Sequence, residues 1–104
     1  MLPGKMGKML QKAQKAQAKM QEEIAALEIE GSAGGGVVKA LVDGQKTVLD
    51  IKISEEVMEE PDAGMVADLV LAAISDAQRK VDEEVQKKMT ELSNMLGLPP
   101  GMGL

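Results

Sequence analysis

The chain has 104 residues, enough for a single domain, and it lacks cysteine, histidine, tyrosine, tryptophan and phenylalanine. Without cysteine it has no disulfide, and without histidine it lacks both the usual proton-transfer side chain near neutral pH and the commonest zinc ligand. Without aromatic residues it has no stacking platform for single-stranded nucleic acid. The formal net charge is −5. We predict a protein that is not an enzyme and that needs no metal or cofactor.

No apolar run approaches the roughly 20 residues that a transmembrane helix needs, and the basic N-terminus continues without the apolar core of a secretory signal. The absence of cysteine suits a reducing compartment. We expect a cytoplasmic protein without membrane contact, built as one domain over residues 1–97 with a flexible Pro/Gly-rich tail over residues 98–104.

The charges are distributed unevenly along the chain. Residues 1–20 carry five lysines and no acidic residue, a local charge of +5. The remaining residues carry seven basic and all seventeen acidic side chains, a local charge of −10. Such a separation indicates a polyanion or a charged partner surface.

The first segment, from Lys5 to Leu27, is predicted to be an amphipathic helix because it is rich in good helix formers. Its apolar residues recur at heptad spacing, with one polar break at Gln17. This seam consists of Met6, Leu10, Ala13, Met20, Ile24 and Leu27. In this register the lysines lie opposite the seam and face water.

The middle of the chain is predicted to be β-structure. A brief alternation over residues 27–30 precedes a glycine-rich turn over residues 31–36. Two strands follow, Val37–Val42 and Gln45–Ile53, joined by Asp43-Gly44, which is a strong signal for a two-residue type I′ hairpin.

The last of these strands alternates imperfectly. One face is expected to hold Thr47, Leu49, Ile51 and Ile53. The other face is expected to hold Lys46, Asp50 and Lys52. Val48 departs from the alternation, so part of the second face is expected to be covered as well.

Two motifs that suggest ligand sites are better interpreted as structural. The glycine run over residues 31–36 lacks the Lys-Ser/Thr of a Walker loop and joins strand to strand, so no helix N-terminus faces a phosphate. The acidic stretch from Glu55 to Asp62 lacks the spacing and central glycine of a calcium loop. We interpret the first as a β-turn and the second as a solvated connection.

A short helical turn is predicted over residues 54–60, and a long helix from Pro61 or Asp62 to about Leu96. Within it, residues 69–74 are apolar on all sides, which a three-stranded sheet covers only in part. The remaining side is predicted to meet a second copy of the chain in a homodimer. The order helix, three strands, helix predicts an α+β fold.

The strongest functional candidate is the lysine row of the first helix. It consists of Lys5, Lys8, Lys12, Lys15 and Lys19. No acidic residue interrupts the row before Glu22, and its ends lie about 21 Å apart at 1.5 Å per residue, enough to face several DNA phosphates. Lysines suit backbone contacts better than base reading, so sequence-tolerant binding to double-stranded DNA is predicted.

A secondary DNA-binding group is predicted on the last helix. It consists of Arg79, Lys80, Lys87 and Lys88. Acidic residues are interleaved with this group, and we expect local ion pairs to account for most of it.

Several segments resemble the YbaB/EbfC family of nucleoid-associated proteins. They are Gly7–Lys15, Met20–Glu23, Leu27–Lys39, Leu71–Lys80 and Leu98–Met102. The resemblance covers essentially the whole chain. It implies αβββα protomers, with a three-stranded antiparallel sheet and two long projecting helices, in a tweezer-like homodimer that binds DNA, associates with the nucleoid and affects gene expression. By position, the five-lysine row matches the family's DNA-contacting region.

One alternative remains open from the residues alone. The amphipathic first helix could dock on another protein, its lysines serving only solubility. Exposure of the seam between Met6 and Leu10 would favour this protein-interaction module.

Overall fold

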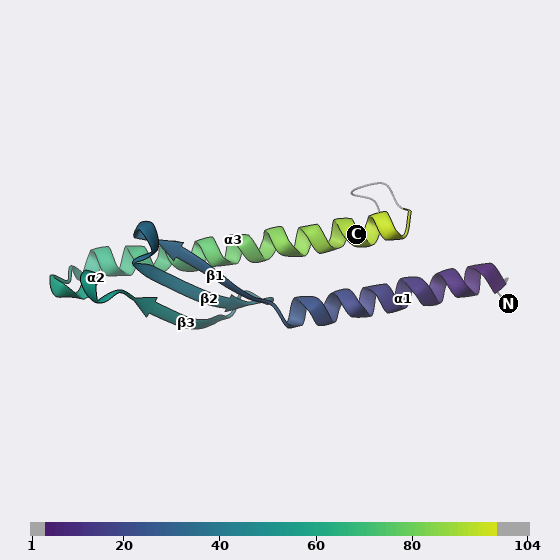
Figure 1. Cartoon of the computed structure of the whole chain (residues 1–104), viewed down its shortest axis with the longest axis horizontal. Coiled ribbons are helices and arrows are strands. Elements are labelled where there is room, and N and C mark those ends of the chain that lie inside the picture. Colours follow the sequence, from purple (N-terminus) through teal and green to yellow (C-terminus); the bar gives the residue numbers. More distant parts are fainter. Residues whose placement is uncertain (1–3, 98–104) are drawn as a thin grey trace.

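The computed structural model describes residues 4–97, which form an elongated α+β molecule 70 Å long. The elements are α1 (Gly4–Ala25), β1 (Glu28–Ala33), the 3₁₀ turn η1 (Gly34–Gly36), β2 (Val38–Asp43), β3 (Val48–Ile53), α2 (Glu55–Glu59) and α3 (Ala63–Met95). Figure 1 shows the sheet lying along the first half of α3, with α1 beside the second half and extending beyond its end. The predicted αβββα order is confirmed, and the predicted flexible tail lies outside the described residues.

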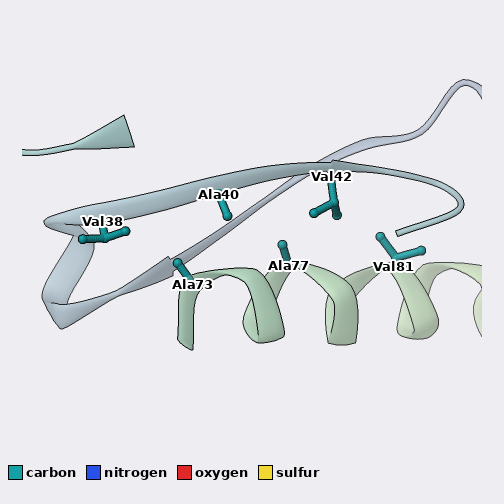
Figure 2. Packing of buried hydrophobic residues seen from close by; sticks show 6 residues of the cluster. All are labelled: Val38, Ala40, Val42, Ala73, Ala77 and Val81. Atoms are coloured by element: carbon teal, nitrogen blue, oxygen red, sulfur yellow. The ribbon is translucent and has the colours of Figure 1, made fainter. Parts of the chain in front are cut away.

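The sheet is antiparallel in the order β1-β2-β3, and its core lies between β2 and α3. Figure 2 shows small side chains facing one another across this contact, and all of them are buried. They are Val38, Ala40, Val42, Ala73, Ala77 and Val81. Since these side chains are short, α3 lies close to the sheet and packs mainly on β1 and β2.

The caps of the two later helices follow from the sequence. The Ser54 side chain accepts a hydrogen bond from the Glu56 amide and begins α2. Asp62, rather than Pro61, caps α3 by accepting a hydrogen bond from the Met65 amide at 3.1 Å. Gly97, with φ of 75°, follows the end of α3 as predicted.

The predicted glycine-rich turn over residues 31–36 is wrong in its first half, because residues 31–33 belong to β1. Gly31 is buried against α3, where an added Cβ would lie 2.5 Å from the Ala73 carbonyl oxygen and closer still to the Ala77 amide nitrogen. Glycine is therefore required here for close packing. Only residues 34–36 turn, and all three have positive φ.

The predicted type I′ hairpin is also wrong. The turn after β2 has a single left-handed residue, Lys46, with φ of 69°, and its amide bonds the Asp43 carbonyl. The Asp43 carboxylate accepts hydrogen bonds from the Gln45 and Thr47 amides at 2.9 and 3.0 Å. Gly44 gives the space that the turn needs beside α1, since a Cβ there would collide with the Ile24 carbonyl.

A β-bulge explains the irregular alternation of β3. Leu41 pairs with Asp50 but Val42 pairs with Val48, so Leu49 is an extra residue in β3. Val48 therefore lies on the face of the sheet that β2 turns toward α3, together with Ile51 and Ile53. The expected placement of Thr47 on this face was wrong, because the bulge shifts the register and Thr47 lies opposite Asp43.

We predict that Gly31→Ala destabilises the protein by about 3 kcal/mol, because β1 must move away from α3 to accommodate the methyl group. Gly64→Ala is the matched control. Its Cβ would meet only Asp62 Oδ1 at 3.4 Å within a helix, where alanine is favoured by about 0.5–1 kcal/mol. Urea unfolding followed by circular dichroism measures both variants, and equal stabilities would contradict the packing role of Gly31.

Candidate nucleic-acid interface

The lysine row runs along α1, and all five of its lysines are exposed. No acidic side chain lies on α1 before Glu22. Among residues 4–97, no ion pair within 4 Å includes a lysine of this row. The row is therefore a stretch of positive charge without a direct ion-pair partner in the described part of the protein, although the Lys19 charge acts on the nearby Glu23 carboxylate.

Helix α1 makes few contacts with the rest of the chain. It has no fully buried residue, and a shallow groove of about 220 Å³ lies between it and the end of α3. The groove is lined by Ala16, Lys19, Met20, Glu23, Lys88, Glu91, Leu92 and Met95. Lys19 borders this groove, but like the other four lysines of the row it is exposed.

The predicted apolar seam of α1 is covered only in part. Ala13, Met20 and Ile24 are half-buried, whereas Met6 and Leu10, nearer the N-terminus, are 55% and 50% exposed. The first turns of α1 extend past the end of α3 (Figure 1). The outer part of the seam thus has no cover within residues 4–97.

An ion pair holds α1 beside α3. Lys88 Nζ lies 3.0 Å from Glu23 Oε2, and the Lys88 side chain is only 16% exposed. This contact raises the pKa of Lys88 and lowers the pKa of Glu23, chiefly through the hydrogen bond between them. A second carboxylate, Glu84, lies 3.9 Å from the same ammonium. The contact joins residues far apart in the chain, so no local spacing predicted it.

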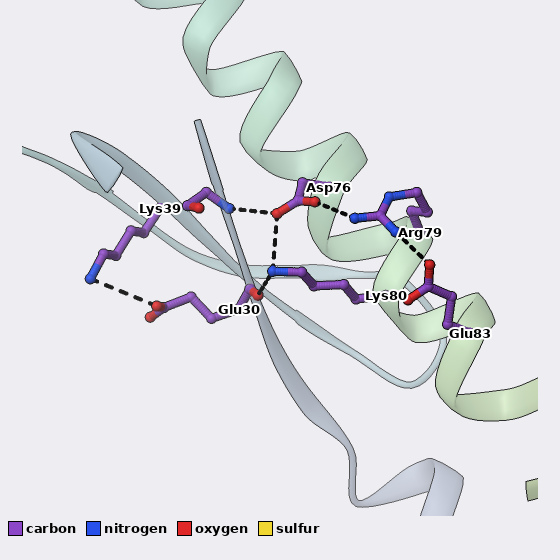
Figure 3. A network of polar contacts seen from close by, with 7 residues as sticks. Glu30, Lys39, Asp76, Arg79, Lys80 and Glu83 are labelled. Atoms are coloured by element: carbon purple, nitrogen blue, oxygen red, sulfur yellow. Dashed lines mark hydrogen bonds and ion pairs between the residues drawn. The ribbon is translucent and has the colours of Figure 1, made fainter. Parts of the chain in front are cut away.

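A second ionic cluster closes the free edge of β1 (Figure 3). Asp76 Oδ2 accepts a hydrogen bond from the Ser32 amide at 3.0 Å, and Lys80 donates to the Glu30 carbonyl at 3.4 Å. Lys80 also lies 3.2 Å from Asp76. Side chains of α3 thus satisfy backbone groups that an edge strand would otherwise expose.

The same cluster engages Arg79, which pairs with Asp76 at 2.8 Å and with Glu83. Three of the four predicted secondary DNA-binding residues therefore have carboxylate partners, namely Arg79, Lys80 and Lys88. Within residues 4–97, Lys87 has no such partner. Lys88 of this group lines the same groove as Lys19, but Glu23 and Glu91 line that groove as well, so the basic surface is interrupted there.

Hydrogen bonding from the Ser32 amide, Arg79 and Lys80 lowers the pKa of Asp76 from 3.8 to about 2. A lowered pKa means that Asp76 stabilises the fold fully above pH 3.8 and loses this effect as pH falls through about 2. We predict that Asp76→Asn lowers the melting temperature above pH 4, and that its difference from the unsubstituted protein disappears near pH 2. Thermal melts over this pH range and up to neutrality measure it.

Asp68→Asn is the control for this test, because Asp68 is an exposed carboxylate on the same helix. Its melting temperature should follow that of the unsubstituted protein at every pH. Equal pH profiles for the two variants would show that Asp76 has no special role in closing the edge of β1.

No helix within residues 4–97 combines the length and apolar character needed to cross a membrane. The fold resembles the crystal structure of an uncharacterized protein from Helicobacter pylori, with a TM-score of 0.64 and 23% sequence identity. That match covers 93% of this chain and 99% of the other. At this identity the match shows the fold alone.

Sequence comparison is more specific. Residues 3–96 match the YbaB/EbfC DNA-binding family. A nucleoid-associated protein of Exiguobacterium sp. is 49% identical over 82 residues, covering 79% of this chain and 78% of the relative. Another, of Agrobacterium fabrum, is 43% identical over 101 residues, covering 97% and 94%. The chain is therefore a member of the YbaB/EbfC DNA-binding family, as the resemblance predicted, and not an enzyme.

Proposed function

We propose that the protein is nucleoid-associated and works as a homodimer whose α1 helices bind the phosphate backbone of double-stranded DNA, with roles in DNA organisation and gene regulation. The observation that carries the proposal is the row of five lysines, without ion-pair partners among residues 4–97, on a helix that extends from the fold. The names of the relatives agree with a nucleoid location.

The lysine row explains how a protein with a net charge of −5 can bind a polyanion. Electrostatic attraction acts over about 10 Å at 0.1 M salt, so the local charge of a projecting helix matters more than the charge of the distant body. Among residues 4–97, six of the seventeen acidic side chains form ion pairs with cations of the same chain, namely Glu23, Glu30, Asp76, Asp82, Glu83 and Glu84. The five lysines remain available for DNA phosphates.

The basic residues of α3 take a secondary part in this proposal. Arg79, Lys80 and Lys88 would have to give up carboxylate partners to bind phosphate, whereas Lys87 would not give up any within the described residues. We therefore rank Lys87 first within this group and the whole group below the lysine row.

Exposed apolar residues beside β3 support the homodimer. Leu71 is 63% exposed, and it shares one side of α3 with Ile74 and Gln78 at helical spacing. The Gln78 side chain donates to the Lys46 carbonyl in the turn before β3, so this is the side toward β3. Val48 and Ile53 of β3 add exposed apolar surface there. We propose that a second copy covers this surface.

A second candidate function is the protein-interaction module, which the exposure of Met6 and Leu10 favours. Charge reversal of three lysines of the row separates the two functions. Loss of DNA binding supports the backbone contacts, whereas unchanged DNA affinity supports docking on another protein.

We predict that Lys8→Gln/Lys12→Gln weakens binding to a random-sequence duplex and makes the log–log salt dependence shallower, by about 0.9 for each phosphate that is no longer neutralised. Fluorescence anisotropy at several salt concentrations measures both effects. Lys39→Gln/Lys52→Gln is the matched control, since it removes the same charge from exposed positions on the sheet. Equal effects of the two double variants would mean that net charge alone, and not the row on α1, sets the affinity.

The dimer surface generates a separate prediction. The unsubstituted protein should have twice the chain mass by light scattering, and Leu71→Glu should shift it to the mass of one chain, because a carboxylate cannot be buried unpaired in an apolar contact. Met65→Glu is the control, at an exposed methionine on another side of α3. Dissociation of both variants, or of neither, would contradict an interface centred on Leu71 and β3.

A further inference from the structure

Met9 on α1 has a highly exposed apolar side chain. At 67% it is the most exposed large apolar residue within residues 4–97. It lies four residues after Lys5 and three before Lys12, so the three side chains are neighbours on one side of α1. An apolar group thus lies directly between two lysines that have no ion-pair partner in the described part of the chain.

This side of α1 is packed only further along the helix. Ala16, two turns after Met9, lines the groove against Met95 at the end of α3. Figure 1 shows α1 continuing past that end. Met9 is not among the residues that line the groove, and its 67% exposure shows that the described residues leave it largely uncovered. The core of the fold therefore gives no reason for a methionine at this position.

We infer that Met9 contacts bases, with α1 lying in the major groove of duplex DNA, the Met9 methyl group against a thymine C5-methyl, and Lys5 and Lys12 on the flanking phosphates. The inference rests on the proposed DNA binding and adds a base-reading residue to it. An α-helix of about 10–12 Å diameter fits the major groove, which is about 12 Å wide. The thymine methyl is an apolar group displayed there, and a flexible thioether adapts well to such a contact.

Charge complementarity favours DNA over the α1 helix of a second copy at this position. A second α1 packed on Met9 would bring another row of lysines against Lys5 and Lys12. Duplex DNA instead places phosphates on both sides of an apolar feature at the groove floor. The lysines then set affinity, whereas Met9 sets a modest preference for A·T pairs within largely sequence-tolerant binding.

The test compares one A·T-rich duplex with the same duplex in which deoxyuridine replaces thymidine, which removes only the C5-methyl groups. The unsubstituted protein should bind the thymidine duplex about fourfold more tightly for each methyl contact. Met9→Gln should bind both duplexes equally. Met65→Gln, at an exposed methionine on α3, should keep the full preference. For each protein, the affinity for the thymidine duplex is divided by the affinity for the deoxyuridine duplex. Comparing this quotient between Met9→Gln and the unsubstituted protein cancels any effect of uracil on DNA stiffness.

The outcomes separate the inference from the proposed function. Binding without discrimination by the unsubstituted protein overturns the role of Met9 and leaves backbone binding intact. A preference that survives in Met9→Gln overturns it as well, as does a Met9→Gln variant that changes mass by light scattering, since Met9 would then contact a second copy. Absence of binding to either duplex overturns both the inference and the proposed function.

Discussion

The structure depends on the close approach of α3 to β1 and β2. Gly31 has no side chain where α3 passes, and the facing helix positions are alanines 73 and 77. A short distance between helix and sheet lets side chains of α3 reach the backbone of β1, where Asp76 and Lys80 bond Ser32 and Glu30. The close approach of the α3 backbone to the β1 backbone thus determines both the packing of the core and the protection of the free edge of β1.

The same close packing leaves part of the apolar surface exposed. A core built from valine and alanine is narrow, so α3 packs mainly on two of the three strands. β3 keeps exposed apolar side chains, and α1 has no fully buried residue. A chain of this size cannot cover all its apolar surface alone, and the uncovered parts are the surfaces on which our proposals of a second copy and of DNA rest.

The charged side chains are also distributed unevenly between α1 and the rest of the fold. Six carboxylates of residues 4–97 form ion pairs, and the Asp76 cluster and the Glu23–Lys88 contact each join α3 to another element. On the first turns of α1, lysines have neither local carboxylates nor contacts from the described part of α3. A negative protein with a positive projecting helix can therefore attract a polyanion at one place and repel it elsewhere, which favours one orientation of binding.

The sequence by itself determined the order of elements, the caps, the lysine row and the family, because these depend on local spacing and residue type. It misplaced features that depend on distant neighbours. Gly31 was interpreted as a turn residue, but it lies in β1, where α3 passes too close for a side chain. Gly44 does lie in a turn, but the sequence did not show that α1 also leaves no space for a side chain there. Likewise, only tertiary structure decided that Glu23 pairs with Lys88 and that the described residues leave Met9 67% exposed, since both depend on where α1 lies against α3.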